Sequence, residues 1–511
     1  MATHPRAGIL DLPTETLVSI LENPTVPTST LYSLAVSCRR LHFVALPIYF
    51  SRHGLTPSSK SIVIDMRTDR RDVLAALQTA LLIPNTEEIT CTFPHPSCTS
   101  IFPLLTHLTR LENYLSRLPS VRHVTLCLDT RGSVCLAVGD DKALRAWTTR
   151  MKSLLNCILE KQCECLTMMY GGQLTKSYKL TPPATRRGPI MRLLSAISCV
   201  LRGRTSEIPP PTFSRVSRQG HAHIEMSLRP PLHHSYKLAS LEIHSAILIL
   251  PPGLSWTLAV LRTCPTISLT LGCHAEAAIP WSAVLPLIAS AATHVTSLTL
   301  SDGDSDSWRY SDAVAEAEIL DFISRLPRLR HLSISHHSQT DFVEGPLLNL
   351  PDLETLRAPA KLILHSLRRS VPPKIQSICV LWSDRDLVSI GLLAAALSAL
   401  PSPPRVSVSV TSSMYRPAFP IAPSFLERVG ALEITPAPYV PLTDITELAA
   451  WVGVFPRVRH VDVAFDPKSQ GFHADLAIFL GAVKVTAVLD KIKVNGRVYN
   501  LPHAGMAPTL T

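Results

Sequence analysis

The sequence predicts an α/β fold in which helices alternate with short parallel strands, preceded by a small helical module. Three observations support this prediction. Apolar, strand-like segments recur through the chain after residue 60, stretches with helical apolar spacing lie between them, and the first 50 residues carry helical spacing alone. With 511 residues and 46% hydrophobic residues, the chain can bury a large core, and 43 prolines against 20 glycines predict short elements.

Residues 8–52 are expected to form three short helices. Pro13 suits the first position of a helix because its missing N–H would have no partner there, and Asn23-Pro24 ends that helix. A second helix is expected after Pro27, and a third apolar turn is expected to end at Pro47. Three helices in about 40 residues bury little apolar surface alone, which is typical of a module that is stabilised by contact with a neighbouring domain or a partner.

A short repeated sequence motif, which we call the refrain, marks the strands of the remaining chain. It is an apolar residue and a Pro, then one polar residue, one apolar residue, Arg-His and an apolar strand. Its three clearest copies are residues 118–126 (LPSVRHVTL), 326–334 (LPRLRHLSI) and 455–463 (FPRVRHVDV).

Nine apolar anchors, one for each looser or closer copy, are spaced about 27 residues apart, which indicates stacked strand-helix units. The anchors are Leu241, Leu269, Leu298, Leu332, Leu356, Ile378, Val408, Leu432 and Val461.

Helical spacing predicts helices between the strands, and Asn495-Gly496 predicts a hairpin over residues 491–499. The predicted helices span residues 72–82, 101–118, 142–160, 313–326, 387–400 and 443–454.

At residues 10–50 the chain resembles the F-box family. The opening Leu-Pro-x-Glu-x-Leu of residues 12–17 and the Cys-Arg-Arg-Leu of residues 38–41 carry the resemblance, whereas Ile48-Tyr49-Phe50 stands where the family often has a tryptophan. The resemblance implies binding to the Skp-type adaptor of an SCF cullin-RING ubiquitin ligase. The implied adaptor-binding residues are Leu12, Pro13, Leu17, Ile20, Leu21, Leu34, Cys38, Arg39 and Leu41.

The repeats of residues 60–500 resemble irregular leucine-rich repeats, and the whole arrangement is similar to F-box proteins of mushroom-forming fungi. This resemblance implies a horseshoe-shaped solenoid with strands on its inner face. Residues 501–511 are expected to be a flexible tail.

Residues 176–237 form a basic, proline-rich insertion that holds almost all of the formal net charge of +10, since it has eleven basic and two acidic residues. Apart from a helix expected over 189–201, its prolines predict a long loop. Arginine fits an acidic or phosphorylated partner because guanidinium pairs with two oxygens. The candidate arginines are Arg186, Arg187, Arg202, Arg204, Arg215 and Arg218, and a solvated loop without a partner is the alternative interpretation.

No intact catalytic motif is found, so we expect a non-catalytic protein without cofactor or metal. Cys163-x-Cys165 lacks the second pair that a zinc site needs. The start of the chain has no signal-peptide pattern and its apolar windows are broken by charges and prolines, which predicts a cytoplasmic or nuclear protein that does not bind membranes.

The sequence therefore favours a substrate receptor that holds the ligase adaptor through residues 8–52 and an unknown target protein through its repeats. Two alternatives remain. One is a repeat scaffold for protein-protein interaction that acts independently of a ligase. The other, which is less favoured because the basic segment has no series of aromatic residues, is a nucleic-acid-binding protein.

Overall fold

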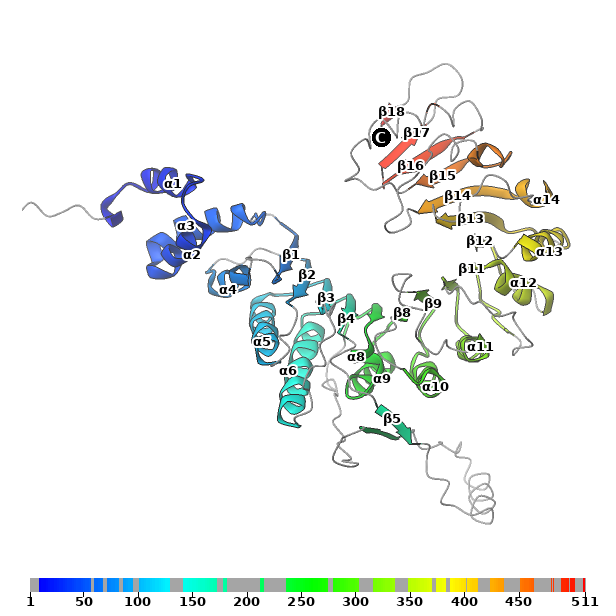
Figure 1. The fold of residues 1–511 in the computed structure, drawn as a ribbon, viewed down its shortest axis with the longest axis horizontal. Helices are drawn as coiled ribbons and strands as arrows, with labels where there is room; N and C mark the ends of the chain where they lie inside the picture. Colours follow the sequence, from blue (N-terminus) through cyan, green and yellow to red (C-terminus); the bar gives the residue numbers. More distant parts are fainter. Residues whose placement is uncertain are drawn as a thin grey trace, which may run out of the picture. The chain divides into compact units, whose positions relative to one another are not determined.

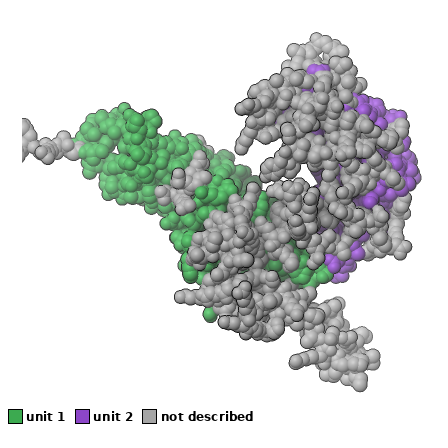
Figure 2. Space-filling view, viewed as in Figure 1, with its two compact units in different colours: residues 1–266, 274–291 green, residues 267–273, 292–511 purple. Residues whose placement is uncertain are grey.

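The computed structural model contains two compact units, residues 1–266 with 274–291 and residues 267–273 with 292–511, coloured separately in Figure 2. The structure describes residues 9–56, 59–67, 71–81, 86–94, 101–128, 141–171, 178–181, 212–215, 236–273, 279–302, 316–335, 348–369, 374–382, 387–400, 402–411, 423–435, 451–463, 479, 481, 489–495, 497–500 and 509–510.

The N-terminal module consists of the 3-10 turn η1 (Ile9–Asp11) and the helices α1 (Thr14–Glu22), α2 (Thr28–Ser37) and α3 (Arg39–Arg52) (Figure 1). Pro13 and Pro27 directly precede α1 and α2, as expected of residues with a fixed φ at a helix start. The expectation that the third helix ends at Pro47 is wrong. Because Phe43, four residues earlier, is exposed, water can reach the carbonyl that Pro47 leaves without its helical N–H partner.

The helix α3 ends instead at Arg52, in a turn that contains Gly54. The Gly54 N–H donates to Ser51 O (2.9 Å) and the Leu55 N–H donates to Phe50 O (2.8 Å), which is the Schellman pattern. Gly54 has φ +72°, a left-handed conformation in which a side chain would be strained. Leu55 is buried beside this turn, so the chain leaves the module in a defined direction.

In the first unit, five parallel strands follow one another in chain order, with helices between them. The strands are β1 (Ser61–Asp65), β2 (Glu88–Phe93), β3 (His123–Leu128), β4 (Cys165–Tyr170) and β7 (Ser240–His244). The helices are α4 (Arg71–Thr79), α5 (Phe102–Arg117), α6 (Asp141–Glu160), α8 (Ala246–Ile249), α9 (Gly253–Thr263) and α10 (Trp281–Ala291).

The second unit repeats this arrangement and ends in antiparallel strands. Its parallel strands are β8 (Ser268–Cys273), β9 (Ser297–Asp302), β10 (His331–Ile334), β11 (Thr355–Pro359), β12 (Ser377–Leu381), β13 (Arg405–Thr411), β14 (Val429–Thr435), β15 (His460–Val463) and β16 (Lys491–Val494). Its helices are α11 (Glu316–Ser324), α12 (Ala360–Arg369), α13 (Leu387–Ser398) and α14 (Pro423–Leu426).

Helices cover one face of each sheet in the described part of the chain, and the burial of the strands follows from this. In β2, for example, Ile89, Cys91 and Phe93 are buried beneath the helices, whereas the alternate residues are not. In Figure 1 the helices α12 and α13 lie along one side of β11–β13. The α/β prediction with a mostly parallel, open sheet is therefore confirmed.

The predicted anchors lie in the strands and are buried, and most of them pair directly. In the second unit, Leu269, Leu298, Leu332, Leu356 and Ile378 form one continuous row across five strands. The anchor Val408 lies one pleat further along its strand, because Ile378 pairs with Val406. The register shifts between Val406 and Ser407, after which Val408, Leu432 and Val461 pair in turn.

The end of the chain confirms the hairpin and changes the prediction of a flexible tail. Strands β16 and β17 (Arg497–Asn500) pair antiparallel around Asn495, whose φ is +47°. Within the residues 501–511 expected to be flexible, Thr509–Leu510 form β18 and pair with β17. A backbone that is hydrogen-bonded to a strand is not free.

Two short strands also correct the prediction of a loop in the basic insertion. β5 (Tyr178–Thr181) and β6 (Thr212–Arg215) form a two-stranded antiparallel sheet. Alternating residues such as Tyr178 and Leu180 suit a strand, a signal that the surrounding prolines outweighed. The helix expected over 189–201 lies outside the described residues. Among helices of the described residues, none is both long and apolar enough to cross a bilayer.

Replacing Leu298 with Ala is expected to lower the free energy of unfolding of the second unit by about 2–5 kcal/mol, because this fully buried side chain packs between two strand neighbours. Urea unfolding followed by circular dichroism measures the change. Thr299→Ala is the control, since the next residue points to the other face of the strand and should change the value by less than about 0.5 kcal/mol. Equal losses in the two variants would contradict the one-sided core.

Candidate partner-binding surfaces

The structure divides the predicted adaptor-binding residues into a core group and a surface group. Leu17, Leu21 and Leu41 are 0, 2 and 3% exposed, so they hold the module together. They can act on a partner only by shaping the surface above them. Leu12, Leu34 and Cys38 are half-buried, and Pro13, Ile20 and Arg39 are exposed.

Several exposed apolar side chains of the module were missed by the sequence-based prediction. Together with Ile20 they are 44–54% exposed, and they are five of the eleven exposed large apolar residues of the described chain. Val36 and Phe43 flank the start of α3, and Arg39 places its guanidinium carbon 5.9 Å from the centre of the Phe43 ring. The exposed apolar residues are Ile9, Leu10, Ile20, Val36 and Phe43.

Two arginines of α3 tie the connecting segments of the module to its core. Arg40 donates to the carbonyl oxygens of Leu10 and Leu12, the latter at 2.6 Å, and so holds the η1 turn at the start of α3. Arg52 donates to the carbonyl oxygens of Leu21 (2.8 Å), Asn23 (2.7 Å) and Val26. The end of α1 leaves carbonyl groups without helical partners, and the Arg52 guanidinium satisfies them.

A buried histidine joins the module to the first strand-helix unit. His42 Nδ1 lies 3.0 Å from Ala35 O, and the Leu81 N–H donates to His42 Nε2 at 3.2 Å. These partners require a neutral imidazole with its proton on Nδ1. His42 therefore fixes how α3 sits against the segment that follows α4.

Within the basic insertion, the structure describes residues 178–181, 212–215 and 236–237. Arg215 lies in β6, and its backbone pairs with Tyr178. The other predicted arginines, Arg186, Arg187, Arg202, Arg204 and Arg218, lie outside the described residues.

The Arg of the sequence refrain has a defined place in the first unit, directly before the strand. We call the residues at this place the strand-start row; in the first unit they are Lys60, Glu87, Arg122, Glu164 and Ala239. At each step, two consecutive N–H groups donate to the carbonyl of the previous row member, as the N–H groups of Arg122 and His123 do to Glu87 O (2.8 and 3.0 Å).

Charges alternate along the strand-start row of the first unit and pair with their neighbours. Lys60 Nζ lies 2.8 Å from Glu87 Oε1, and Arg122 lies 3.6 Å from Glu87 and 3.8 Å from Glu164. The hydrogen bond from Lys60, followed by the nearby positive charges, keeps the pKa of Glu87 below its ordinary value. Every anion in this row therefore has a cation beside it.

The strand-start row of the second unit begins with the uncharged residues Ile267 and Thr296 and reaches its first ion pair at Arg330. Arg330 lies 3.9 Å from Glu354, in the pattern of the first unit. The row then continues through Gln376 and Pro404. Beyond the register shift between β13 and β14, a further stretch of the row runs through Gly430, Arg459 and Asp490. Charge alternation is interrupted over three positions, and Arg459 has no acidic row member on the side of Gly430.

The face of the second sheet opposite its helices carries a network of ion pairs. Arg357 of β11 reaches across β12 to donate to Ser409 Oγ of β13 (3.0 Å) and to the Glu433 carboxylate of β14. Further along, Lys493 Nζ lies 2.9 Å from Asp462 Oδ2. These groups are already paired, so they stiffen the face and leave little unpaired charge for a ligand.

The described cysteines are buried or half-buried: Cys91, Cys157, Cys163 and Cys264 are buried, and Cys38, Cys127, Cys165 and Cys379 are half-buried. Cys163 Sγ donates to Arg122 O (3.3 Å) and Cys165 O (3.1 Å), and its burial raises the pKa of the thiol to about 12. No cluster of three or more metal-ligating side chains occurs among the described residues.

No protein-family model and no curated protein matches this chain.

Replacing Arg52 with Met is expected to loosen the connection between α1 and α2, because the carbonyl groups of Leu21, Asn23 and Val26 lose their shared donor. The local stability should fall by about 1–3 kcal/mol, the cost of losing hydrogen bonds to a charged group. Native-state proteolysis between residues 22 and 28 measures it. Arg39→Met is the control, since Arg39 makes no hydrogen bond to a described carbonyl; equal cleavage of both variants would contradict this role.

Raised pKa values predict slow alkylation of the buried thiols. Burial raises the pKa of Cys157 to about 11 and of Cys163 to about 12, so at pH 8 only about one thiol in a thousand or fewer is the reactive thiolate. Iodoacetamide at pH 8, with sites read by mass spectrometry, should modify both cysteines at least about 100-fold more slowly in the native chain than in urea. Comparable rates in the two states would show that these thiols are not buried.

Proposed function

We propose that this chain is the substrate-recognition subunit of an SCF-type cullin-RING ubiquitin ligase. In this proposal, residues 8–52 are an F-box that binds the Skp-type adaptor, and the following strand-helix units are irregular leucine-rich repeats of a horseshoe-shaped solenoid that binds a target protein. The chain supplies proximity between ligase and target, and other subunits supply the chemistry.

The exposed apolar surface of the helical module is the observation that carries the proposal. A module of this size gains most by covering its apolar groups, and the F-box-like residue Ile20 belongs to this surface. Leu17, Leu21 and Leu41 form its core, while Ile20, Val36 and Phe43 face outward. The Arg40 bonds to Leu10 and Leu12 hold the η1 turn, with exposed Ile9 and Leu10, at the start of α3.

One observation favours the alternative of a scaffold that does not join a ligase. Tyr49 and Phe50, which stand where the F-box family often has a tryptophan, are 2% and 9% exposed. Tyr49 contacts the rings of Tyr32 and His53, with centroids 5.8 and 4.6 Å away, so this end of α3 serves the module's own core. Adaptor binding would then depend on the remaining apolar surface.

An Ile20→Asp, Val36→Asp double variant tests the proposal, because both side chains are exposed and their replacement leaves the core intact. Recovery of the Skp-type adaptor in co-purification should fall at least about 30-fold, as expected when apolar anchors of an interface are replaced by charges. The control is Val63→Asp with Leu392→Asp, which changes two similarly exposed apolar residues outside the module.

Two results would decide against a ligase receptor. One is failure of the wild-type chain to recover the adaptor. The other is equal recovery by the wild type and the module variant, because the exposed apolar surface would then have no part in binding.

A further inference from the structure

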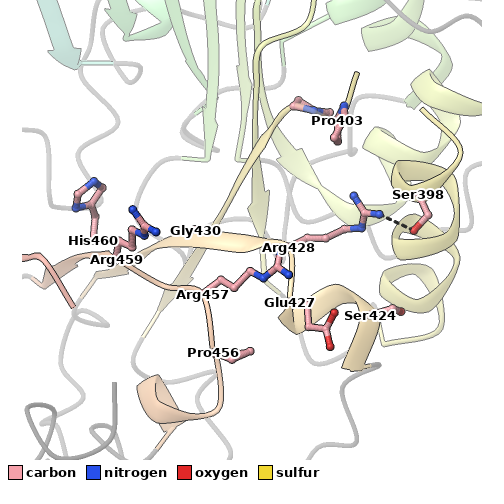
Figure 3. Close-up of a pocket in the computed structure, with 11 residues that line it drawn as sticks. Ser398, Pro403, Ser424, Glu427, Arg428, Gly430, Pro456, Arg457, Arg459 and His460 are labelled. Carbon is pink, nitrogen blue, oxygen red and sulfur yellow. Dashed lines mark hydrogen bonds between the residues drawn. The ribbon is translucent and has the colours of Figure 1, made fainter. Parts of the chain in front are cut away.

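A pocket of about 900 Å³ lies where the strand-start row of the second unit loses its charges (Figure 3). It is open to solvent at the start of β13, β14 and β15. Its described lining residues are Ser398, Pro403, Pro404, Ser424, Glu427, Arg428, Gly430, Pro456, Arg457, Arg459 and His460.

Gly430 leaves this pocket unfilled. It occupies the row position before Arg459, and its carbonyl accepts the Arg459 N–H at 3.0 Å. In the first unit, Glu87 holds the same position relative to Arg122 and pairs with it. A Cβ built on Gly430 would approach only Val406 O, at 3.9 Å, so packing does not require a glycine here.

The arginines around the pocket have no acidic partner among the described residues. Arg457 and Arg459 are exposed, and neither side chain has an ion-pair partner among the described residues. Among the described residues, the Arg428 guanidinium donates to the neutral hydroxyl of Ser398, at 3.0 Å. Since Glu427 is the single acidic residue of the described lining, three arginines leave an excess of two positive charges with His460 neutral.

The cations are spread along the pocket. In Figure 3, Arg459 and His460 lie at one side, Arg428 extends toward Ser398 at the other, and Arg457 lies between them. One compact anion would reach only part of this set, whereas an extended segment with several spaced carboxylates would reach all of it. The described lining contains no Phe, Tyr or Trp for bases to stack on, and Pro403, Pro404 and Pro456 offer flat apolar contacts for a peptide.

We propose that this pocket binds an acidic peptide segment of a partner protein, whose carboxylates take the position that Glu87 occupies beside Arg122 in the first unit. The inference rests on the proposed function in that it names the kind of target segment that the receptor would recognise. The guanidinium groups of Arg457 and Arg459 bind the carboxylates, and Arg428 anchors the far end of the segment.

Fluorescence anisotropy of the full-length chain tests this with three labelled probes of about eight units each: a peptide alternating Glu and Ser, the same peptide with Gln for Glu, and single-stranded oligothymidylate. The Glu peptide should bind, the Gln peptide should bind at least about tenfold more weakly, and added salt should weaken the Glu complex. Equal binding of the two peptides would overturn the proposal. Tighter binding of the oligothymidylate through the same arginines would overturn it as well.

The refrain supplies a matched pair of variants. Arg457 and Arg459 occupy the same places as Arg328 and Arg330 in an earlier copy, where Arg330 has Glu354 beside it. The R457A/R459A variant should bind the Glu peptide at least about tenfold more weakly, and R328A/R330A should stay within about twofold of the wild type. Equal effects of the two variants would mean that general positive charge, and not this pocket, attracts the peptide.

Gly430→Glu provides a test that does not remove a cation. The new carboxylate would copy the pairing of Glu87 with Arg122, so the Glu peptide should lose at least about tenfold in affinity while the melting temperature holds or rises. Unchanged peptide affinity would overturn the proposal. Adaptor recovery by all these variants should match the wild type, and failure of adaptor binding with intact peptide binding would remove the ligase function and leave the pocket assignment standing.

Discussion

The placement of helices on one face of each described sheet is the constraint from which the rest of the structure follows. It makes every second strand residue a core residue, and the parallel register then lines these residues up, as in the row from Leu269 to Ile378. Each strand and the helix that follows it bury their apolar faces against the neighbouring strands and helices, which is how stacked strand-helix elements gain stability. The opposite face and the edge where strands begin are left to carry polar groups.

Many of these groups are charges paired with an opposite charge, but the arginines around one pocket have no such partner in the described chain. On the open face of the second sheet, Arg357, Glu433, Asp462 and Lys493 are paired with one another. Along the strand-start row of the first unit, each charge has an opposite neighbour. The pocket beside Gly430 is the described place where several cations gather without such neighbours, and that contrast is what marks it as a binding site.

Periodic features were predictable from sequence, because a periodicity of two or of 3.6 residues directly reports which side chains share a face. The strand anchors and most helices follow from it, and the refrain correctly marked strand starts at His123, His331 and His460. Val408 was placed one pleat off from Ile378, since the register of two strands is set by how they pair and not by the periodicity of either strand.

The surfaces were harder to predict. The apolar stripes of the helical module identified its core residues, such as Leu17 and Leu41, as contacts, while outward residues such as Phe43 lack a periodic signal. The pocket depends on Gly430, Arg428 and Arg457, which belong to two different repeats. Only the folded arrangement brings a missing side chain in one repeat next to the arginines of the following one.

We propose that one chain holds a ligase adaptor and an acidic target segment on separate surfaces that share no residue. The most direct measurement is the affinity of the Glu peptide for the full chain with and without saturating Skp-type adaptor, with the size of the complex determined at the same time. We expect one assembly that contains adaptor, chain and peptide, and a peptide affinity that the adaptor leaves unchanged. Displacement of the peptide by the adaptor, or absence of the three-component assembly, would contradict the claim.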